Sequence, residues 1–447
     1  MKFTKFGKAL LISALSAGVI LSVTSCVRSY TVGYLYVTGT VTSQSNGNGI
    51  ISGYKIDHNT GFLTPINGLP VSSGGANPGR AVLLTGSRFM YVLNQGTNAQ
   101  GGTTCTTTNP CQNSNITQFA VGGNGILTPQ ETFYTQGINP FRLIADTSGS
   151  YLMVLDHDSP SNAACALALG PSATTCGDIT IFQINSTTGR LTLVVNAQVT
   201  SAGGSPLTYF PVQANPIDFV LSSGFILTLS GTSSTGDAVF PYVYSSSTGQ
   251  LTLGQNSPQP LLGIKQATAI VAASDGVLYV LDNEPVTIGA GGTFAAGTYP
   301  SQILPFSVAN NGALQAKTGG IIPDDPSLAN PIYVLLESKS KFLYVANQGN
   351  NTTGVNAQSG ITGYFETSSP SYQLSFLAPS TFGSGAGPQC IVEDPSDQFI
   401  YEANFYDSSI TGRSIDVNDG VLNPLRVSSS YKLQGQANWC LIDGRTN

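Results

Sequence analysis

The sequence has 447 residues, a formal net charge of −6, and 41% hydrophobic against 9% charged residues. The acidic balance argues against nucleic acid as a partner, because phosphate binding needs a basic surface, and the hydrophobic content argues against disorder. The length fits two or three ordinary domains or one large closed repeat architecture.

The chain begins with what reads as an export signal. Three lysines among the first eight residues precede an apolar run over 9–23, and small residues then stand directly before Cys26. This pattern resembles the lipobox of bacterial lipoproteins, in which that cysteine is lipidated and becomes the mature N-terminus. We therefore predict a signal peptide over 1–25 and a short lipidated linker over 26–31. The alternative is an uncleaved membrane anchor, but the apolar run is short for a span and is interrupted by Ser and Gly.

One phrase recurs along the rest of the chain. FMYVLNQGTN at 89–98 returns as FLYVANQGNN at 342–351, and weaker forms of its first half bring the total to seven copies, 52 to 74 residues apart. That spacing is typical of propeller blades with variable loops and is too irregular for a solenoid. We call the copies anchors: YLYVTG (34–39), FMYVLN (89–94), YLMVLD (151–156), FILTLS (225–230), VLYVLD (277–282), FLYVAN (342–347) and FIYEAN (399–404).

Each anchor lies inside a larger unit. An apolar strand, often opened by Asn-Pro, precedes it, and a variable loop and a β-hairpin follow it. Four short strands in each of seven units predict an all-β, seven-bladed propeller of antiparallel blades over 32–447. The glycines at the hairpin tips supply the positive φ that such turns require. They are Gly61, Gly125, Gly189, Gly249, Gly312 and Gly420.

The two ends of the repeat indicate how the ring closes. The first anchor, at Tyr34, has no opening strand before it, whereas the chain ends with ANWCLIDG (437–444), an opening strand with no anchor after it. We predict that this C-terminal strand completes the first blade, which removes the free sheet edges of the ring. We expect Trp439, the single tryptophan, to belong to the core.

The cysteine count fits an exported protein. Removing Cys26 from seven cysteines leaves six, and an exported protein keeps disulfides. The spacing predicts three disulfides: Cys105 with Cys111, Cys165 with Cys176, and Cys390 with Cys440. The last pair is uncertain from the repeat, because Cys390 and Cys440 hold the same position in neighbouring blades and their side chains should point the same way around the ring.

The L-Y-V-[TAV]-N phrase, the Asn-Pro strand and the closing G-x-L-T hairpin resemble the YVTN-type propellers and the seven-bladed lactonase family, which includes propeller-type 6-phosphogluconolactonases. The resemblance covers essentially the whole mature chain and implies the propeller fold; lactone hydrolysis follows only by analogy. The family's histidines are missing at the matching positions of this chain, where the strands open with Pro140-Phe141-Arg142 and Pro216-Ile217-Asp218. This departure weakens the case for catalysis.

The long insertions indicate which face carries the function. They fall at 95–114, 157–177, 283–300 and 348–359, in loops that leave the second strand of a blade and so share one face with the Asn-Pro turns. We call this the decorated face. Elaborated loops on a rigid scaffold are where binding surfaces usually form.

Charged residues are rare enough to single out on this face. Arg80 and Arg142 begin innermost strands near the channel mouth, where they can bind a carboxylate or a lactone oxygen, or pair with Asp218. The motif Asp156-His157-Asp158 contains one of the two histidines, which can act as a general base or help to hold a metal. Successive side chains of a strand diverge, however, and the alternative is an ordinary surface histidine. The position of Arg80 and Arg142 corresponds in other blades to Asp218, Ile270, Tyr333, Cys390 and Cys440.

Most anchors end in a polar residue. These side chains either form a ring of ligands for a sugar or a cation, or cap the turn that leaves the strand by bonding their own backbone. We favour the caps, because a residue that recurs from blade to blade is explained by blade geometry. The residues are Asn94, Asp156, Asp282, Asn347 and Asn404.

We thus predict a lipid-anchored, monomeric propeller of the bacterial cell envelope, on its periplasmic side or at the cell surface, that binds a protein or glycan partner through the decorated face. The alternative is a lactone hydrolase at the channel mouth. We predict no cofactor and no metal. The candidate catalytic residues are Arg142, His157 and Asp156, and the candidate binding residues are Arg80, Asp158, Asp218, Asp282, Glu284, Tyr333 and Asn347.

Overall fold

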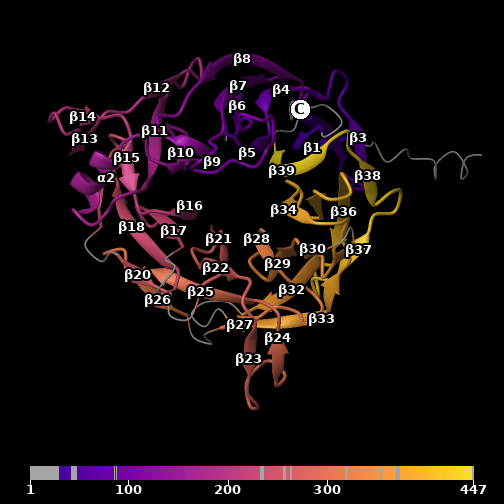
Figure 1. The fold of residues 1–447 in the computed structure, drawn as a ribbon. Helices are drawn as coiled ribbons and strands as arrows, with labels where there is room; N and C mark the ends of the chain where they lie inside the picture. The colour runs from indigo at the N-terminus through magenta and orange to yellow at the C-terminus, as the bar shows by residue number, and fades with distance from the viewer. Residues whose placement is uncertain are drawn as a thin grey trace, which may run out of the picture.

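The computed structural model describes residues 30–41, 48–84, 86, 88–231, 236–254, 258–261, 264–317, 321–352, 355–367 and 373–444. The predicted signal peptide and the lipidation site Cys26 lie outside these residues. Seven antiparallel sheets stand around a central axis, each forming one blade (Figure 1). The predicted seven-bladed propeller is confirmed.

The blades follow one another in chain order, and the strands of each blade succeed one another from the axis outward. Blade 1 consists of β39 (Gln436–Asp443), β1 (Thr31–Thr40), β2 (Asn48–Asp57) and β3 (Leu63–Pro65), with β4 (Val71–Ala76) also paired to β2. Blade 2 consists of β5 (Pro78–Leu83), β6 (Phe89–Asn94), β7 (Asn115–Val121) and β8 (Leu127–Phe133). Blade 3 consists of β9 (Ile138–Ala145), β10 (Tyr151–Asp158), β11 (Gly177–Ile184) and β12 (Leu191–Leu193), with β15 (Phe210–Val212) also paired to β11.

The second half of the ring repeats this plan. Blade 4 consists of β16 (Pro216–Ser222), β17 (Phe225–Ser230), β18 (Ala238–Tyr244) and β19 (Leu251–Leu253), with β20 (Gln259–Pro260) on β18. Blade 5 consists of β21 (Ala267–Ala272), β22 (Leu278–Asp282), β25 (Gln302–Val308) and β26 (Leu314–Ala316), with β27 (Ile322–Pro323) on β25. Blade 6 consists of β28 (Pro331–Leu336), β29 (Phe342–Asn347), β32 (Gly360–Glu366) and β33 (Leu374–Phe382). Blade 7 consists of β34 (Pro388–Glu393), β35 (Phe399–Asn404), β36 (Ser409–Ile415) and β37 (Leu422–Pro424), with β38 (Ser430–Lys432) on β36.

Small elements decorate this frame. The helix α2 (Asn162–Leu169) lies in the 157–177 insertion, which the Cys165–Cys176 disulfide closes. Two-stranded hairpins occupy other insertions and the outer side of blade 3. They are β13 (Asn196–Thr200) with β14 (Pro206–Leu207), β23 (Val286–Ile288) with β24 (Gly297–Tyr299), and β30 (Asn350–Thr352) with β31 (Val355–Ala357).

The anchors are the second strands of the blades, and their aromatic residues join neighbouring blades. The ring of Phe342 packs against Gly420 of the next blade, where a Cβ would lie 2.5 Å from the ring. The hydroxyl of Tyr344 donates a hydrogen bond to the carbonyl of the same glycine at 2.8 Å. The six predicted hairpin glycines all have φ between +66° and +83°. Gly420 is thus required both by the positive φ of its turn and by the close approach of Phe342 from the preceding blade. The same tyrosine contact occurs for Tyr36 on Gly125, Tyr91 on Gly189 and Tyr401 on Gly61.

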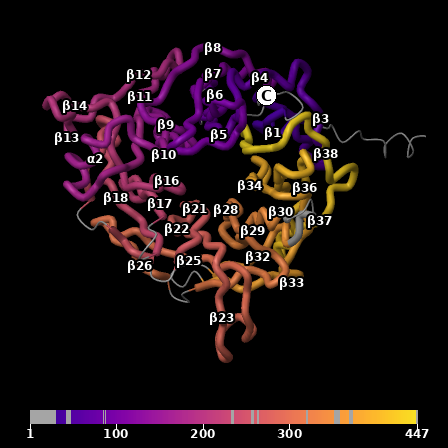
Figure 2. The backbone as a smooth tube through the Cα atoms, in the orientation of Figure 1, coloured from indigo at the N-terminus to yellow at the C-terminus, as the bar shows by residue number. Residues whose placement is uncertain are grey.

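The C-terminal strand closes the ring as predicted. β39 pairs antiparallel with β1, with Cys440 opposite Val37, and in Figure 2 the yellow end of the chain lies beside the indigo beginning. Cys390 in β34 lies opposite Ala403, one anchor position further along. The two cysteines are therefore offset by one residue and point to opposite sides of their strands.

This offset brings Cys390 and Cys440 together across the boundary between blades 7 and 1. Their Cα atoms are 5.9 Å apart and they form a disulfide. The predicted pairing is confirmed, as are the Cys105–Cys111 and Cys165–Cys176 pairs. The expectation that Cys390 and Cys440 share one repeat position is wrong, because the register of β39 on β1 places Trp439 there instead.

Candidate functional site

A β-bulge at the start of each innermost strand builds the site. In all seven blades the register shifts directly after the opening turn. Where an Asn-Pro turn precedes it, the asparagine has φ between +51° and +58°. A bulge leaves one residue without a cross-strand partner and redirects its side chain. The bulge residues are Gly79, Phe141, Ile217, Thr268, Ile332, Gln389 and Asn438.

Six of these seven residues line one hollow of about 340 Å³, which we call the channel-mouth pocket. It opens on the decorated face, since Asn77 of an opening turn and the first residues of two long loops, Gln95 and Gln348, also line it. The rings of Phe405 and Trp439 and the guanidinium groups of Arg80 and Arg142 complete its wall. The expectation that Trp439 belongs to the core is therefore only partly right: its side chain packs against two hydrophobic core clusters, and the residue also lines the pocket.

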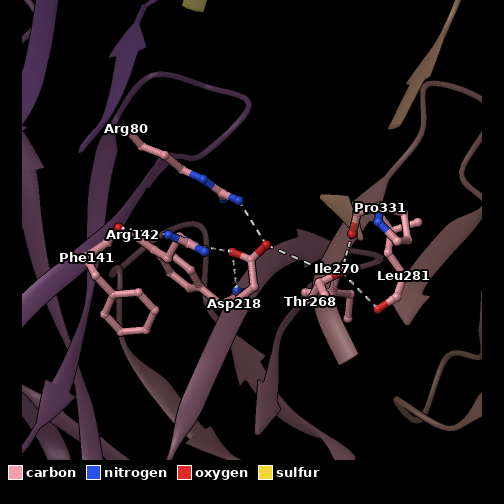
Figure 3. A network of polar contacts seen from close by, with 9 residues as sticks. Arg80, Phe141, Arg142, Asp218, Thr268, Ile270, Leu281 and Pro331 are labelled. Carbon is pink, nitrogen blue, oxygen red and sulfur yellow. Dashed lines mark hydrogen bonds and ion pairs between the residues drawn. The ribbon is translucent and has the colours of Figure 1, made fainter. Parts of the chain in front are cut away.

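Two arginines share one carboxylate at this pocket (Figure 3). Nη2 of Arg80 lies 2.8 Å from Oδ2 of Asp218, and Nε of Arg142 lies 3.2 Å from Oδ1. Asp218 is fully buried, whereas the side chains of Arg80 and Arg142 keep 13% and 28% of their exposure. The cluster therefore leaves one positive charge uncompensated beside the pocket.

The surroundings hold the two guanidinium groups in different ways. Burial and the nearby charge of Arg80 lower the pKa of Arg142 to about 10, while the carboxylate of Asp218 raises it. Arg142 therefore remains charged at neutral pH. The guanidinium of Arg80 lies 4.8 Å from the centre of the Trp439 ring, a cation–π contact. Trp439 in turn meets the edge of the Tyr333 ring at 5.2 Å. Tyr333 thus contacts a residue of the pocket wall and is not itself part of the lining.

A second hollow of about 220 Å³ adjoins the first, and we call it the side lobe. Gln95 and Phe141 line both hollows. The side lobe is lined further by Thr103, Cys105, Cys111, Asn139, Pro140 and His157. The Cys105–Cys111 disulfide, which closes a loop of the 95–114 insertion, thus forms one of its walls.

The structure does not bring the three candidate catalytic residues to one point. Arg142 faces the channel-mouth pocket and His157 the side lobe, and Phe141 contacts both: Cζ of Arg142 is 5.2 Å and the His157 ring 5.8 Å from the Phe141 ring centre. Nδ1 of His157 lies 3.4 Å from Oδ2 of Asp158. The third residue, Asp156, is buried inside blade 3.

Asp156 stands opposite another acid. It is the direct cross-strand partner of Asp178, and the hydroxyl of Thr180 lies 3.3 Å from Asp156 and 3.5 Å from Asp178. Burial raises the pKa of Asp156 to about 7. Burial and the charge of Asp156 raise the pKa of Asp178 well above its ordinary value. The raised pKa values follow from the burial of two neighbouring acids inside the blade, and neither acid lines the two hollows.

The other anchor ends also point into their blades. Nδ2 of Asn347 donates to the hydroxyl of Thr362 at 2.9 Å, and Oδ2 of Asp282 accepts from Gln302 at 2.6 Å. The interpretation of these residues as turn caps is therefore only partly right: blade geometry does explain them, but their partners are mainly side chains of the third strand. Burial raises the pKa of Asp282 to about 6. Glu284 accepts the backbone N–H of Lys265, and neither acid lines the two hollows.

In blade 5, the predicted counterpart of Arg80 and Arg142 is Ile270, which is wrong by one residue. Ala269 lies opposite the fifth residue of its anchor, as Asp218 does, so it is the counterpart of Arg80 and Arg142; Ile270 is one residue further. The residues that sequence reasoning missed, such as Gln389 and Asn438, share one detectable signal. They are the residues directly before this repeat position, where the bulge occurs.

A resident metal finds no ready site in the part of the chain that the structure describes. No group of three or more His, Cys, Asp or Glu residues is arranged there to hold an ion. No helix among the same residues is long and apolar enough to cross a membrane.

Comparisons with known proteins bear on the fold. No protein-family model and no curated protein sequence matches the chain. In structure it is similar to a candidate 6-phosphogluconolactonase of Bacteroides fragilis, at a TM-score of 0.61 and 14% identity over 92% of this chain and 98% of the other. It is similar to a second such protein of Bacteroides uniformis, at 0.63 and 13% over 92% and 99%. A periplasmic gluconolactonase of Pseudomonas aeruginosa is similar at 0.61 and 17% over 92% and 99%. At these identities the likeness supports the shared propeller fold.

Proposed function

We propose that this protein is an exported propeller that binds a sugar acid, or the acidic end of a glycan, in the channel-mouth pocket. The observation that carries the proposal is the pair Arg80 and Arg142 on the single carboxylate of Asp218. In a chain with a net charge of −6, this cluster offers guanidinium donors to an anion on the decorated face. Guanidinium groups are well suited to carboxylates, because their N–H donors match the spacing of two oxygens.

The rest of the wall suits a sugar. Carboxamides of Asn77, Gln95, Gln348, Gln389 and Asn438 line the pocket beside the Trp439 ring, so hydroxyl groups and a C–H face would both find partners. Nε2 of Gln389 is buried without a hydrogen-bond partner among the described residues. The volume of about 340 Å³ lies near the lower end of the range for small-molecule sites, roughly 300 to 1,000 Å³. The pocket therefore favours a glycan over a protein as the partner.

We also propose a location outside the cytoplasm, with the lipid on Cys26 holding a monomer to the bacterial cell envelope, on the periplasmic side or at the cell surface. Three disulfides support an oxidising compartment. Metabolic labelling with a clickable fatty acid, compared with a Cys26→Ala variant, tests the anchor. Labelling of the variant at the level of the wild type would refute it.

Calorimetric titration of the mature domain tests the binding function. Glucuronate, galacturonate and gluconate are compared with glucose and galactose at moderate salt. We expect at least one acid to bind in the micromolar range and the matching neutral sugar to bind at least about tenfold more weakly, since one charged hydrogen bond contributes about 1.5 to 3 kcal/mol. Equal binding of acid and neutral sugar, or no binding of any acid, would overturn the proposal.

A second candidate function is the hydrolysis of a sugar lactone. His157 favours it, because it lines the side lobe and its Nδ1 lies 3.4 Å from Oδ2 of Asp158; the structural similarity to lactonases favours it as well. Such a reaction needs a base to activate water and a donor for the oxyanion, the roles that His157 and Arg142 would fill. The test is the rate of acid release from glucono-1,5-lactone above background, with Arg142→Gln and His157→Ala combined. A rate that the double variant leaves unchanged would remove this candidate.

A further inference from the structure

The side lobe adjoins the channel-mouth pocket, and the Cys105–Cys111 disulfide forms part of its lining. The two hollows have Gln95 and Phe141 in common, and both open on the decorated face. A ligand whose acidic group is bound at Arg142 can therefore extend past the edge of Phe141 into a further space of about 220 Å³. The walls of the lobe decide which chemical group can occupy that space.

The lobe is held in shape by hydrogen bonds that join its walls. Oδ1 of Asn139 accepts the backbone N–H of Cys111 at 2.7 Å, and its Nδ2 donates to Oδ2 of Asp158 at 2.9 Å. The hydroxyl of Thr107 donates to Oδ1 of Asp158 at 3.0 Å. Together with the disulfide, these contacts fix the insertion to the opening turn of blade 3. A site prepared in this way loses less conformational freedom when a ligand binds.

The lining indicates a neutral and amphipathic group. Among the residues that the structure describes, no Asp, Glu, Lys or Arg lines the lobe, in contrast to the pocket beside it. Pro140, Phe141 and the disulfide present apolar surface. The imidazole of His157, whose Nδ1 lies 3.4 Å from Oδ2 of Asp158, brings ring nitrogens that can exchange hydrogen bonds with a hydroxyl group. Apolar walls with hydrogen-bonding groups at the rim match the C–H face and the hydroxyl edge of a sugar ring.

We propose that the side lobe binds a neutral sugar residue linked to the acidic one, so that the two hollows together recognise a disaccharide unit of an acidic glycan. The inference rests on the proposed binding of a sugar acid in the channel-mouth pocket. It adds the second residue of the ligand and assigns to His157 and the Cys105–Cys111 loop the recognition of that residue.

The experiment compares glucuronate with a β-linked glucuronosyl-glucose disaccharide by calorimetry. We expect the disaccharide to bind the wild-type domain about tenfold more tightly, and the ratio to fall to about twofold in His157→Ala and in the double variant Cys105→Ala with Cys111→Ala. His58→Ala is the matched control, because the other histidine stacks on Tyr30, away from both hollows. The control should keep the tenfold ratio.

The outcomes separate the two claims. If glucuronate binds and the disaccharide binds no more tightly, the side lobe has no part in recognition and this inference is overturned, while the pocket stands. If the ratio is tenfold in the wild type and unchanged in both lobe variants, the second sugar lies elsewhere and the inference also fails. If neither ligand binds, the proposed function fails and the inference fails with it.

Discussion

Nη2 of Arg80 lies 2.8 Å from Oδ2 of Asp218, although the two residues are 138 positions apart in the sequence. Asp218 also accepts from Nε of Arg142 and, at 3.4 Å, from the backbone N–H of Ile270. One carboxylate thus contacts the innermost strands of four consecutive blades. Asp218 therefore links neighbouring blades and compensates one of the two positive charges beside the channel-mouth pocket, and these two effects can be separated by mutation.

Asp218→Asn should lower stability and raise affinity for an anion. The two guanidinium groups lose their counter-charge, so we expect the free energy of unfolding to fall by about 2 to 4 kcal/mol, toward the lower end for a buried pair because Arg142 is partly exposed. Removing the competing carboxylate should strengthen glucuronate binding about threefold or more. Urea unfolding and calorimetry measure the two effects. Weaker binding of glucuronate would show that Asp218 itself contacts the ligand.

Glu131→Gln is the matched control for this change. It removes one acid from an exposed ion pair with Arg190, at 3.5 Å on the outer surface. An exposed pair contributes about 0 to 1 kcal/mol, so we expect little loss of stability and no change in affinity.

The hairpin glycines should be sensitive because of the neighbouring blade as well as the turn. Gly420 and Gly276 both have positive φ, but a Cβ on Gly420 would lie 2.5 Å from Phe342, whereas Gly276 has open space around it. Gly276→Ala should cost about 1 kcal/mol for the left-handed backbone and Gly420→Ala about 3 kcal/mol or more. Equal losses in urea unfolding would contradict this account of how the blades pack.

Ring closure depends on β39. Deleting 437–447 removes the innermost strand of blade 1 and exposes β1, so we expect no cooperative unfolding transition by circular dichroism. Removing 445–447 alone leaves β39 whole and should preserve the transition. Replacing Cys390 and Cys440 by Ser keeps the strand but removes its covalent link, at a cost of about 2 to 4 kcal/mol. A well-folded protein without 437–447 would refute the closure model.

The buried acids predict a stability that falls as pH rises. Burial raises the pKa of Asp156 from its ordinary 3.8 to about 7, so the folded state binds more protons than the unfolded state between about pH 4 and 7. The free energy of unfolding therefore falls as pH rises from about 4 to 7, because unfolding then releases the proton that Asp156 holds in the folded state. In blade 2 the equivalent pair is Asn94 and Asn115, which are joined by a hydrogen bond of 2.9 Å and do not titrate.

Asp156→Asn should therefore remove part of this pH dependence. We expect the variant to be more stable than the wild type at pH 8, on the order of 1 kcal/mol, and nearly equal to it at pH 5. A loss of stability in Asp156→Asn that is the same at both pH values would contradict the raised pKa of Asp156.

The sequence predicts the fold because the same local physics is repeated seven times. Each anchor is the short, largely apolar run of a strand that is buried on both faces, and each predicted hairpin has a glycine where the turn requires positive φ. The closure by β39 also follows, because one opening strand is left over at the C-terminus. These features depend on short stretches of chain, and predicting them requires no knowledge of side-chain direction.

The site is less predictable because its residues come from bulges on different blades. A shift of one residue reverses the direction of a side chain, which is why Cys390 and Cys440 meet although they looked equivalent, and why Trp439 faces the pocket. Asp156 and His157 are adjacent in the sequence, yet one is buried in the blade and the other lines the side lobe. The positions of Arg80 and Arg142 near the channel mouth could be predicted from the sequence. Whether the two arginines pair with Asp218 or are free to bind a ligand could not be decided from it.

The most direct test of the central claim is the binding of a sugar acid to Arg142→Gln. Arg190→Gln removes the same charge from an exposed pair on the outer surface and is its matched control. In calorimetric titrations with glucuronate, we predict that Arg142→Gln weakens binding at least tenfold, because it removes a charged donor of about 1.5 to 3 kcal/mol, and that Arg190→Gln leaves it unchanged. Equal affinities in all three proteins would contradict the assignment of the channel-mouth pocket as the binding site.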